Sequence, residues 1–128
     1  MVPDAATATH PPPPDPAARA GAFRYDAATP FDRIGDGLSQ TLLLGETAND
    51  VGPWLRGGPS TVRGLDDGKS AKPLIGAGGQ FGGYYPNGAY FAMCDGSVRN
   101  ITPQITRGVL LDLATIDGGN EAKLPGEQ

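Results

Sequence analysis

The sequence has few of the residues from which most reactive centres are built. Its 128 residues include one cysteine, Cys94, and one histidine, His10. A single cysteine excludes an intrachain disulfide. One cysteine and one histidine, so far apart in the chain, do not form the ligand set of a structural zinc site. The longest apolar runs, residues 41–44 and 89–94, are too short to cross a bilayer.

Clustered positive charge is also lacking. Ten Lys and Arg stand against 14 Asp and Glu, which gives a net charge of -4 and an isoelectric point near 4.7. Nucleic-acid binding and electrostatic binding to a membrane surface both need basic residues gathered on one face. We therefore expect neither kind of partner.

Glycine and proline, in contrast, are abundant. The chain has 20 glycines and 13 prolines, while Leu, Ile, Val and Phe together make up about a fifth of it. We expect a single small, loop-rich domain over residues 23–119. Residues 1–22, with the run PPPP, are predicted to be a disordered Pro/Ala-rich segment, and residues 120–128 a flexible tail.

The stretch YFAMCDGSVRNI, residues 90–101, is predicted to be a hairpin. An Asp-Gly pair favours a two-residue type I′ loop, because both positions then need positive φ. We therefore interpret Asp95 and Gly96 as residues that set the bend, and we assign no chemistry to them. The resulting register pairs Met93 with Val98, Phe91 with Asn100, Ala92 with Arg99 and Tyr90 with Ile101, with Met93, Val98 and Phe91 on the buried face.

A second strand is expected over residues 41–47, because three consecutive leucines suit a strand covered on both faces. A short helical turn at residues 38–41 is the alternative for its beginning. Asp36 and Gly37 supply the turn that enters the strand, and Glu46 ends it and is expected to bond to backbone amides. The lone Trp54 is expected to bury its ring and so anchor a long surface loop.

The segment TPQITRGVLLDLATIDGG is predicted to be a helix. Thr102 suits the N-cap and Pro103 the first helical position, while Gly118 and Gly119 suit the end. An apolar stripe runs through Ile105, Val109, Leu110, Leu113 and Ile116. The predicted fold class is α+β, a small antiparallel sheet with a C-terminal helix.

Catalytic motifs are not found. The stretch GLDDGKS lacks the glycine spacing of a phosphate-binding loop and puts two aspartates where phosphates would lie. Cys94 lies beside Asp95, whose charge raises a thiol pKa, and no base is in evidence. We therefore expect no enzyme and no cofactor.

Four blocks of the sequence resemble a bacterial family of prepilin-like proteins whose shared domain has no assigned function. DGLSQTLLLGE is similar to an internal segment of that family, GPWLRGGPSTVRG to its middle block, YPNGAYFAMCDGSVRNIT to its C-terminal signature of His, nine residues and Asp-Gly, and TRGVLLDLATIDGGNE to its closing helix. Tyr85 stands where the signature has histidine. The resemblance covers residues 23–121.

The resemblance implies a non-enzymatic structural or interaction domain, like the globular head of type II secretion or type IV pilus-like subunits. Its partners would be proteins, namely subunits of such an assembly. Members of the family are anchored in the inner membrane and face the periplasm. This chain as written carries no leader or anchoring helix, so the expectation for it alone is cytoplasmic, and one face of its sheet would lack a cover.

Three alternatives stay open at this point. One is a calcium- or small-ligand-binding module, because some pseudopilin heads hold calcium in a C-terminal loop; Asp95, Asp112 and Asp117 are the candidate ligands. Another is a truncated gene fragment without independent function. A hydrolase ranks last, and it would gain support only from an activity switched on by Tyr85→His.

Overall fold

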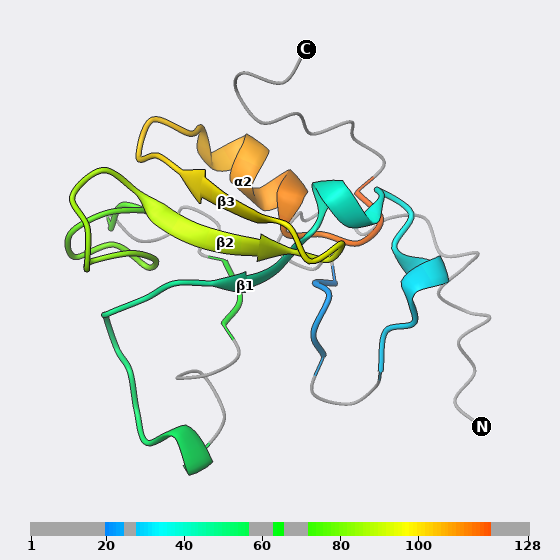
Figure 1. Ribbon diagram of the computed structural model, residues 1–128, viewed down its shortest axis with the longest axis horizontal. Coiled ribbons are helices and arrows are strands. Elements are labelled where there is room, and N and C mark those ends of the chain that lie inside the picture. Colours follow the sequence, from blue (N-terminus) through cyan, green and yellow to red (C-terminus); the bar gives the residue numbers. More distant parts are fainter. Residues whose placement is uncertain (1–19, 25–27, 57–62, 66–71, 119–128) are drawn as a thin grey trace.

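The computed structural model describes residues 20–24, 28–56, 63–65 and 72–118 (Figure 1). The tail over residues 120–128 and nearly all of the Pro/Ala-rich segment lie outside these ranges. The elements are, in chain order, the 3-10 turns η2 (Phe31–Arg33) and η3 (Leu38–Gln40), strand β1 (Leu42–Gly45), the 3-10 turn η4 (Trp54–Arg56), strands β2 (Ala89–Met93) and β3 (Val98–Ile101), and helix α2 (Arg107–Leu113).

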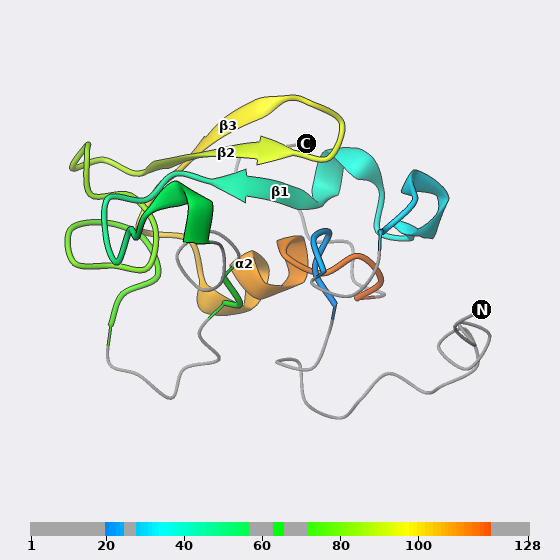
Figure 2. The same cartoon turned by 90° about the horizontal axis from the view of Figure 1, so that it is seen from below.

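The described chain forms two layers, a three-stranded sheet and one short helix. The strands follow the order β1-β2-β3 and both pairs are antiparallel. Figure 2 shows the sheet nearly edge on, with α2 against one of its faces. The predicted α+β class, with a small antiparallel sheet and a C-terminal helix, is confirmed.

The core lies between these layers. Strand β2 alternates in burial, with Ala89, Phe91 and Met93 buried and Tyr90 exposed, as expected for a strand with one face against a core. Helix α2 contributes Leu110 and Leu113, which lie three positions apart and so share one face. Leu74, Ile75 and Ile101 complete the buried cluster.

The hairpin forms, but the predicted register was wrong by one residue. The observed pairs are Ala89 with Ile101, Tyr90 with Asn100, Phe91 with Arg99 and Ala92 with Val98. Because side chains alternate between faces, this shift moves Val98 from the predicted buried face to the exposed one, where it is 66% exposed.

The length of the loop explains the shift. The Gly96 amide donates to the Met93 carbonyl at 3.0 Å, and the Met93 amide donates to the Ser97 carbonyl at 2.8 Å. The loop therefore has three residues, Cys94, Asp95 and Gly96. Gly96 has a φ of +86°, whereas Asp95 does not have a positive φ. A type I turn followed by a left-handed glycine fits this pattern, and a type I′ turn does not.

Strand β1 is shorter and less covered than predicted. It spans Leu42–Gly45, and the alternative helical turn before it exists as η3. The pairing with β2 is irregular between Leu42 and Leu44, which is the mark of a β-bulge. The prediction that all three leucines are covered on both faces was wrong, because β1 is an edge strand and Leu44 is 59% exposed.

Helix α2 begins later and ends earlier than predicted. Its N-cap is Thr106, whose hydroxyl oxygen accepts from the Val109 amide, while the Thr102 carbonyl accepts from the Ile105 amide to close a separate turn. At the other end the backbone of Ile116 bonds to Ala20 and Asp36. These tertiary bonds draw the chain out of the helix before Gly118.

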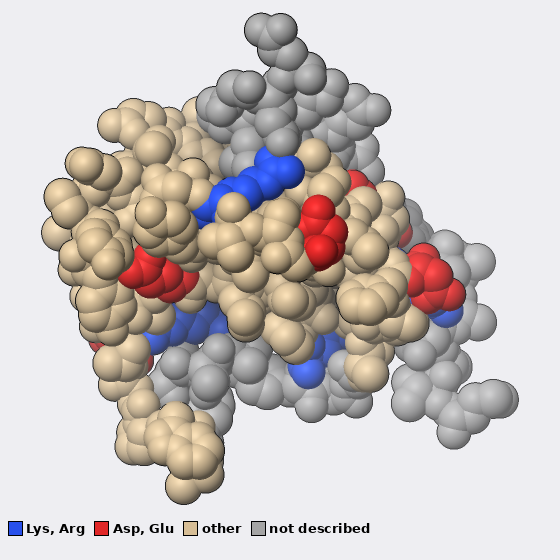
Figure 3. Space-filling model, in the orientation of Figure 1, with Lys and Arg blue, Asp and Glu red and all other residues tan. Residues whose placement is uncertain are grey.

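The segment over residues 51–56, which ends in η4, stands away from the body of the protein. Figure 1 shows η4 set apart from the sheet, and Figure 3 shows a projection at the same place, with charged side chains scattered singly over this face. Trp54 is 82% exposed and Leu55 is 78% exposed. The prediction that the Trp54 ring is buried was therefore wrong. We call the exposed apolar side chains of Val51, Trp54 and Leu55 the η4 knob.

Candidate functional site

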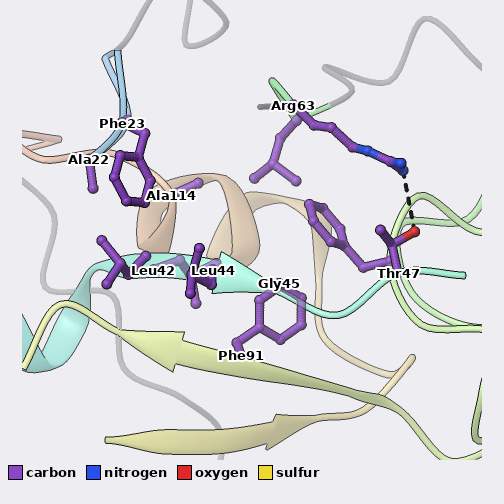
Figure 4. Close-up of a pocket in the computed structure, with 13 residues that line it drawn as sticks. Ala22, Phe23, Leu42, Leu44, Gly45, Thr47, Arg63, Phe91 and Ala114 are labelled. Atoms are coloured by element: carbon purple, nitrogen blue, oxygen red, sulfur yellow. Dashed lines mark hydrogen bonds between the residues drawn. The ribbon is translucent and has the colours of Figure 1, made fainter. Parts of the chain in front are cut away.

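An apolar groove of about 180 Å³ lies beside strand β1. Its walls come from six parts of the chain that are separated in sequence, and Figure 4 shows most of them around strand β1. The lining residues are Gly21, Ala22 and Phe23, the strand residues Leu42, Leu43, Leu44 and Gly45, Thr47, Arg63 and Leu65, Phe81 and Phe91, and Ala114.

Gly45 allows two aromatic rings to close the inner wall of the groove. The rings of Phe81 and Phe91 have centroids 5.2 Å apart and are tilted by 56°. A Cβ atom at Gly45 would lie 2.7 Å from an atom of each ring, which is closer than carbon atoms pack. The absence of a side chain at Gly45 is therefore a requirement of this wall.

One end of the groove is polar. Nη1 of Arg63 donates to the Thr47 hydroxyl at 3.2 Å and to the Gln80 carbonyl at 3.4 Å, and Nη2 donates to the Asp50 carbonyl at 3.0 Å. All three acceptors are neutral oxygens. In Figure 4 the Arg63–Thr47 contact lies at one end of the groove, and Phe23, Leu42 and Ala114 lie towards the other.

Asp36 and Gly37, which were predicted to set the entry to β1, lie just before η3. The Asp36 carboxylate accepts from the Gly118 amide at 2.7 Å, and its own amide donates to the Ile116 carbonyl. Gly37 has a φ of +94°, and its carbonyl accepts from the hydroxyl of the fully buried Thr41. Asp36 thus joins the start of the fold to the segment after α2.

Glu46 follows β1, and its side-chain carboxylate accepts a hydrogen bond that its backbone carbonyl would accept in a regular sheet. Its carbonyl accepts from the Gly82 amide at 2.7 Å. The Tyr90 amide of β2, which a regular ladder would pair with that carbonyl, donates instead to the Glu46 carboxylate at 3.0 Å. The carboxylate therefore lets the chain leave the sheet without orphaning the Tyr90 amide.

The hairpin loop carries two groups with shifted pKa values. The Ser97 hydroxyl and amide donate to the Asp95 carboxylate at 2.6 and 2.9 Å, and these bonds lower the pKa of Asp95. Burial, and secondarily the charge of Asp95, raises the pKa of the Cys94 thiol. The Cys94 amide donates to the Thr41 carbonyl at 2.8 Å, which ties this loop to the end of η3.

The calcium candidates do not form a site within the described ranges. Asp95 lies in the hairpin loop, Asp112 in α2 and Asp117 just beyond it. Over these ranges no three or more His, Cys, Asp or Glu side chains gather in a way that could hold a metal ion.

Tyr85, at the position of the signature histidine, is exposed and contacts Tyr90 edge to face, with ring centroids 6.3 Å apart. It does not line the groove.

Where the chain is described, none of its helices has the length and apolar character needed to cross a membrane.

Sequence reasoning missed the groove and the knob. Arg63 and Phe81 meet β1 only through tertiary contacts, so no local pattern points to them. The exposed η4 knob was missed because a lone tryptophan is usually taken as a core residue.

Comparison with known proteins identifies one family. The family described as "Protein of unknown function (DUF1559)" matches residues 2–72, more than half of the chain. Neither the curated proteins nor the solved structures contain a match. The hairpin and α2 lie outside the matched range, so the C-terminal signature stays a prediction. The chain therefore belongs to the DUF1559 family of proteins of unknown function.

Proposed function

We propose that this chain is a non-enzymatic structural or interaction domain that contacts other proteins, as the globular head of a type II secretion or type IV pilus-like subunit does. One observation carries the proposal: ten large apolar side chains of the described residues face solvent. Exposed apolar surface on a small protein is typical of an interaction surface. The exposed set comprises Phe23, Phe31, Leu44, Val51, Trp54, Leu55, Tyr84, Tyr85, Tyr90 and Val98.

The described titratable groups support the non-enzymatic part of the proposal. The Cys94 thiol is buried and its pKa is raised, so little of it is the reactive thiolate at neutral pH. The pKa of the Asp95 carboxyl is lowered, which makes it a weaker general base and leaves it ionised at neutral pH. Both pKa shifts make the group less suited to act as a nucleophile or a general base.

The pilus-like part of the proposal is supported by the four sequence blocks and by the α+β architecture. The resemblance implies an antiparallel sheet that normally lies against an N-terminal helix; the described sheet is antiparallel, and its covered face lies against the C-terminal helix α2. The strand β1 and the turn that enters it belong to the first of these blocks and lie within the matched family range.

Site-specific photo-cross-linking in cells that make this protein tests the proposal. A photoreactive amino acid replaces Tyr90, which is exposed on β2, and the matched control places it at Ala89, the fully buried neighbour. We expect adducts from position 90 with proteins that carry a prepilin-type N-terminal helix, and none from position 89. Adducts only with unrelated soluble enzymes, or no adduct at position 90, would contradict the proposal.

A further inference from the structure

The η4 knob and the groove beside β1 are complementary features of one chain. The knob presents the only tryptophan of the sequence on a projecting 3-10 turn, with Leu55 and Val51 beside it. Tryptophan is the residue type most enriched among the side chains that dominate protein–protein binding. The groove is apolar and opens to solvent along Leu44 and Phe23.

The sizes of the two features agree. A cavity of roughly 150 Å³ lined by aliphatic and aromatic side chains takes up one benzene molecule, and the groove measures about 180 Å³. It therefore has room for one six-membered ring, so an indole, which has nine ring atoms, would enter with its benzene ring and leave the rest at the open side of the groove. Arg63 closes one end, and a guanidinium is the cation found most often against a tryptophan ring.

The knob does not occupy the groove of its own chain. None of the residues Val51, Trp54 and Leu55 lines the groove, and the Trp54 ring remains 82% exposed. Figure 1 shows η4 projecting away from the sheet. A contact between the two features must then join two molecules.

We propose that the η4 knob of one copy inserts Trp54 into the groove beside β1 of a second copy. The contact is head to tail, since different surfaces of the two copies meet, and such a contact extends into a chain unless a rotation closes it into a ring. This inference rests on the proposed function as an interaction domain and names its partner as another copy of this chain.

The contact is small in area. A buried aromatic side chain removes roughly 150–250 Å² from solvent, and even with Leu55 and Val51 the total falls below the roughly 1,000 Å² of a stable interface. The association is therefore weak and reversible. Neighbouring contacts in an assembly would add to it.

Tryptophan fluorescence of the purified full chain tests the insertion, because Trp54 is its only tryptophan. We expect the emission maximum to shift to the blue as the concentration rises to about 1 mM, with a parallel rise in sedimentation coefficient. Leu44→Lys charges the groove and should abolish both changes. Its matched control, Val98→Lys, alters a residue of similar exposure (66% against 59%) outside the groove, and should leave both unchanged.

Mixing two variants gives the sharpest readout. Trp54→Ala keeps the groove and has no tryptophan, while Leu44→Lys keeps the knob and loses the groove. Titrating Trp54→Ala into Leu44→Lys should shift the fluorescence of the latter to the blue and yield a one-to-one dimer without larger species. The Phe31→Ala variant, which lacks an exposed aromatic ring elsewhere on the surface, should associate as the wild-type chain does.

Three results would overturn the inference: no concentration-dependent shift in the wild-type chain, loss of association in Val98→Lys to the same extent as in Leu44→Lys, or no shift in the mixed titration. Circular dichroism of each variant confirms folding, which exposed positions should not disturb. If one of these three results is found while position-90 adducts to pilin-like proteins still form in cells, only the inferred self-contact is refuted. If the chain self-associates but those adducts are not found, the proposed pilus-like function is refuted instead.

Discussion

Replacing Gly45 with alanine tests the packing of the inner wall of the groove. Gly45 does not have a positive φ, so alanine meets no backbone strain and the whole effect is steric. The new Cβ would lie 2.7 Å from atoms of both Phe81 and Phe91. The Phe91 side chain is fully buried on the core-facing side of β2, so its ring cannot swing into solvent to make room.

The cost can be estimated from overpacking in other cores. Forcing extra carbon atoms into a well-packed site costs roughly 1–3 kcal/mol, and we expect about 2 kcal/mol for Gly45→Ala, because only Phe81 can shift. For a small domain whose free energy of unfolding is roughly 5–15 kcal/mol, this is a clear loss. Urea denaturation followed by circular dichroism measures it as a lower midpoint with an unchanged slope.

Gly108→Ala is the matched control, because it is the same substitution with the opposite expected sign. Gly108 lies on the exposed side of α2 with no atom within 4 Å of the Cβ position. Alanine there should raise the free energy of unfolding by up to about 1 kcal/mol through helix propensity. Gly45→Ala with wild-type stability, or greater, would refute the close approach of the two rings to Gly45.

Three further predictions concern single groups. The Asp95 pKa is lowered on folding, so the contribution of its carboxylate to the free energy of unfolding is present above the unfolded pKa and is lost as pH falls through the folded pKa. The urea midpoints of wild type and Asp95→Asn should therefore converge below about pH 4. Cys94, buried with a raised pKa, should react slowly with a thiol reagent at pH 8 and rapidly in urea; fast labelling of the folded chain would contradict its burial. Glu46→Ala leaves the Tyr90 amide without its acceptor and should lower the free energy of unfolding by about 1 kcal/mol and speed hydrogen exchange of that amide, whereas Glu46→Gln should keep most of both.

The elements that could be predicted from the sequence are those set by local chemistry. The alternation of Phe91 and Met93 with polar or small residues marks β2, and an Asp-Gly pair after it marks a reversal. Thr106 would have served as the N-cap just as well as Thr102, and the local pattern does not choose between them. The choice is made by the turn that Ile105 closes.

The register and the site could not be predicted, because each depends on a distant contact or on one backbone angle. The register turns on whether Asp95 has a positive φ, and a difference of one loop residue moves Val98 to the other face. The groove needs Arg63 and Phe81 to meet β1, and nothing near either residue in the sequence signals that meeting. The exposure of Trp54 likewise depends on how its loop packs against the rest of the protein, which no local pattern in the sequence indicates.

Isotope-filtered nuclear Overhauser spectroscopy on a mixture of labelled and unlabelled chains tests the self-contact most directly. The contact that we infer predicts cross-peaks between the Trp54 indole of one copy and the Leu44 methyl groups of another, at concentrations where sedimentation shows association. Cross-peaks from the indole to Val98 or Tyr90 instead, or an associated state in which the indole contacts no other copy, would contradict it.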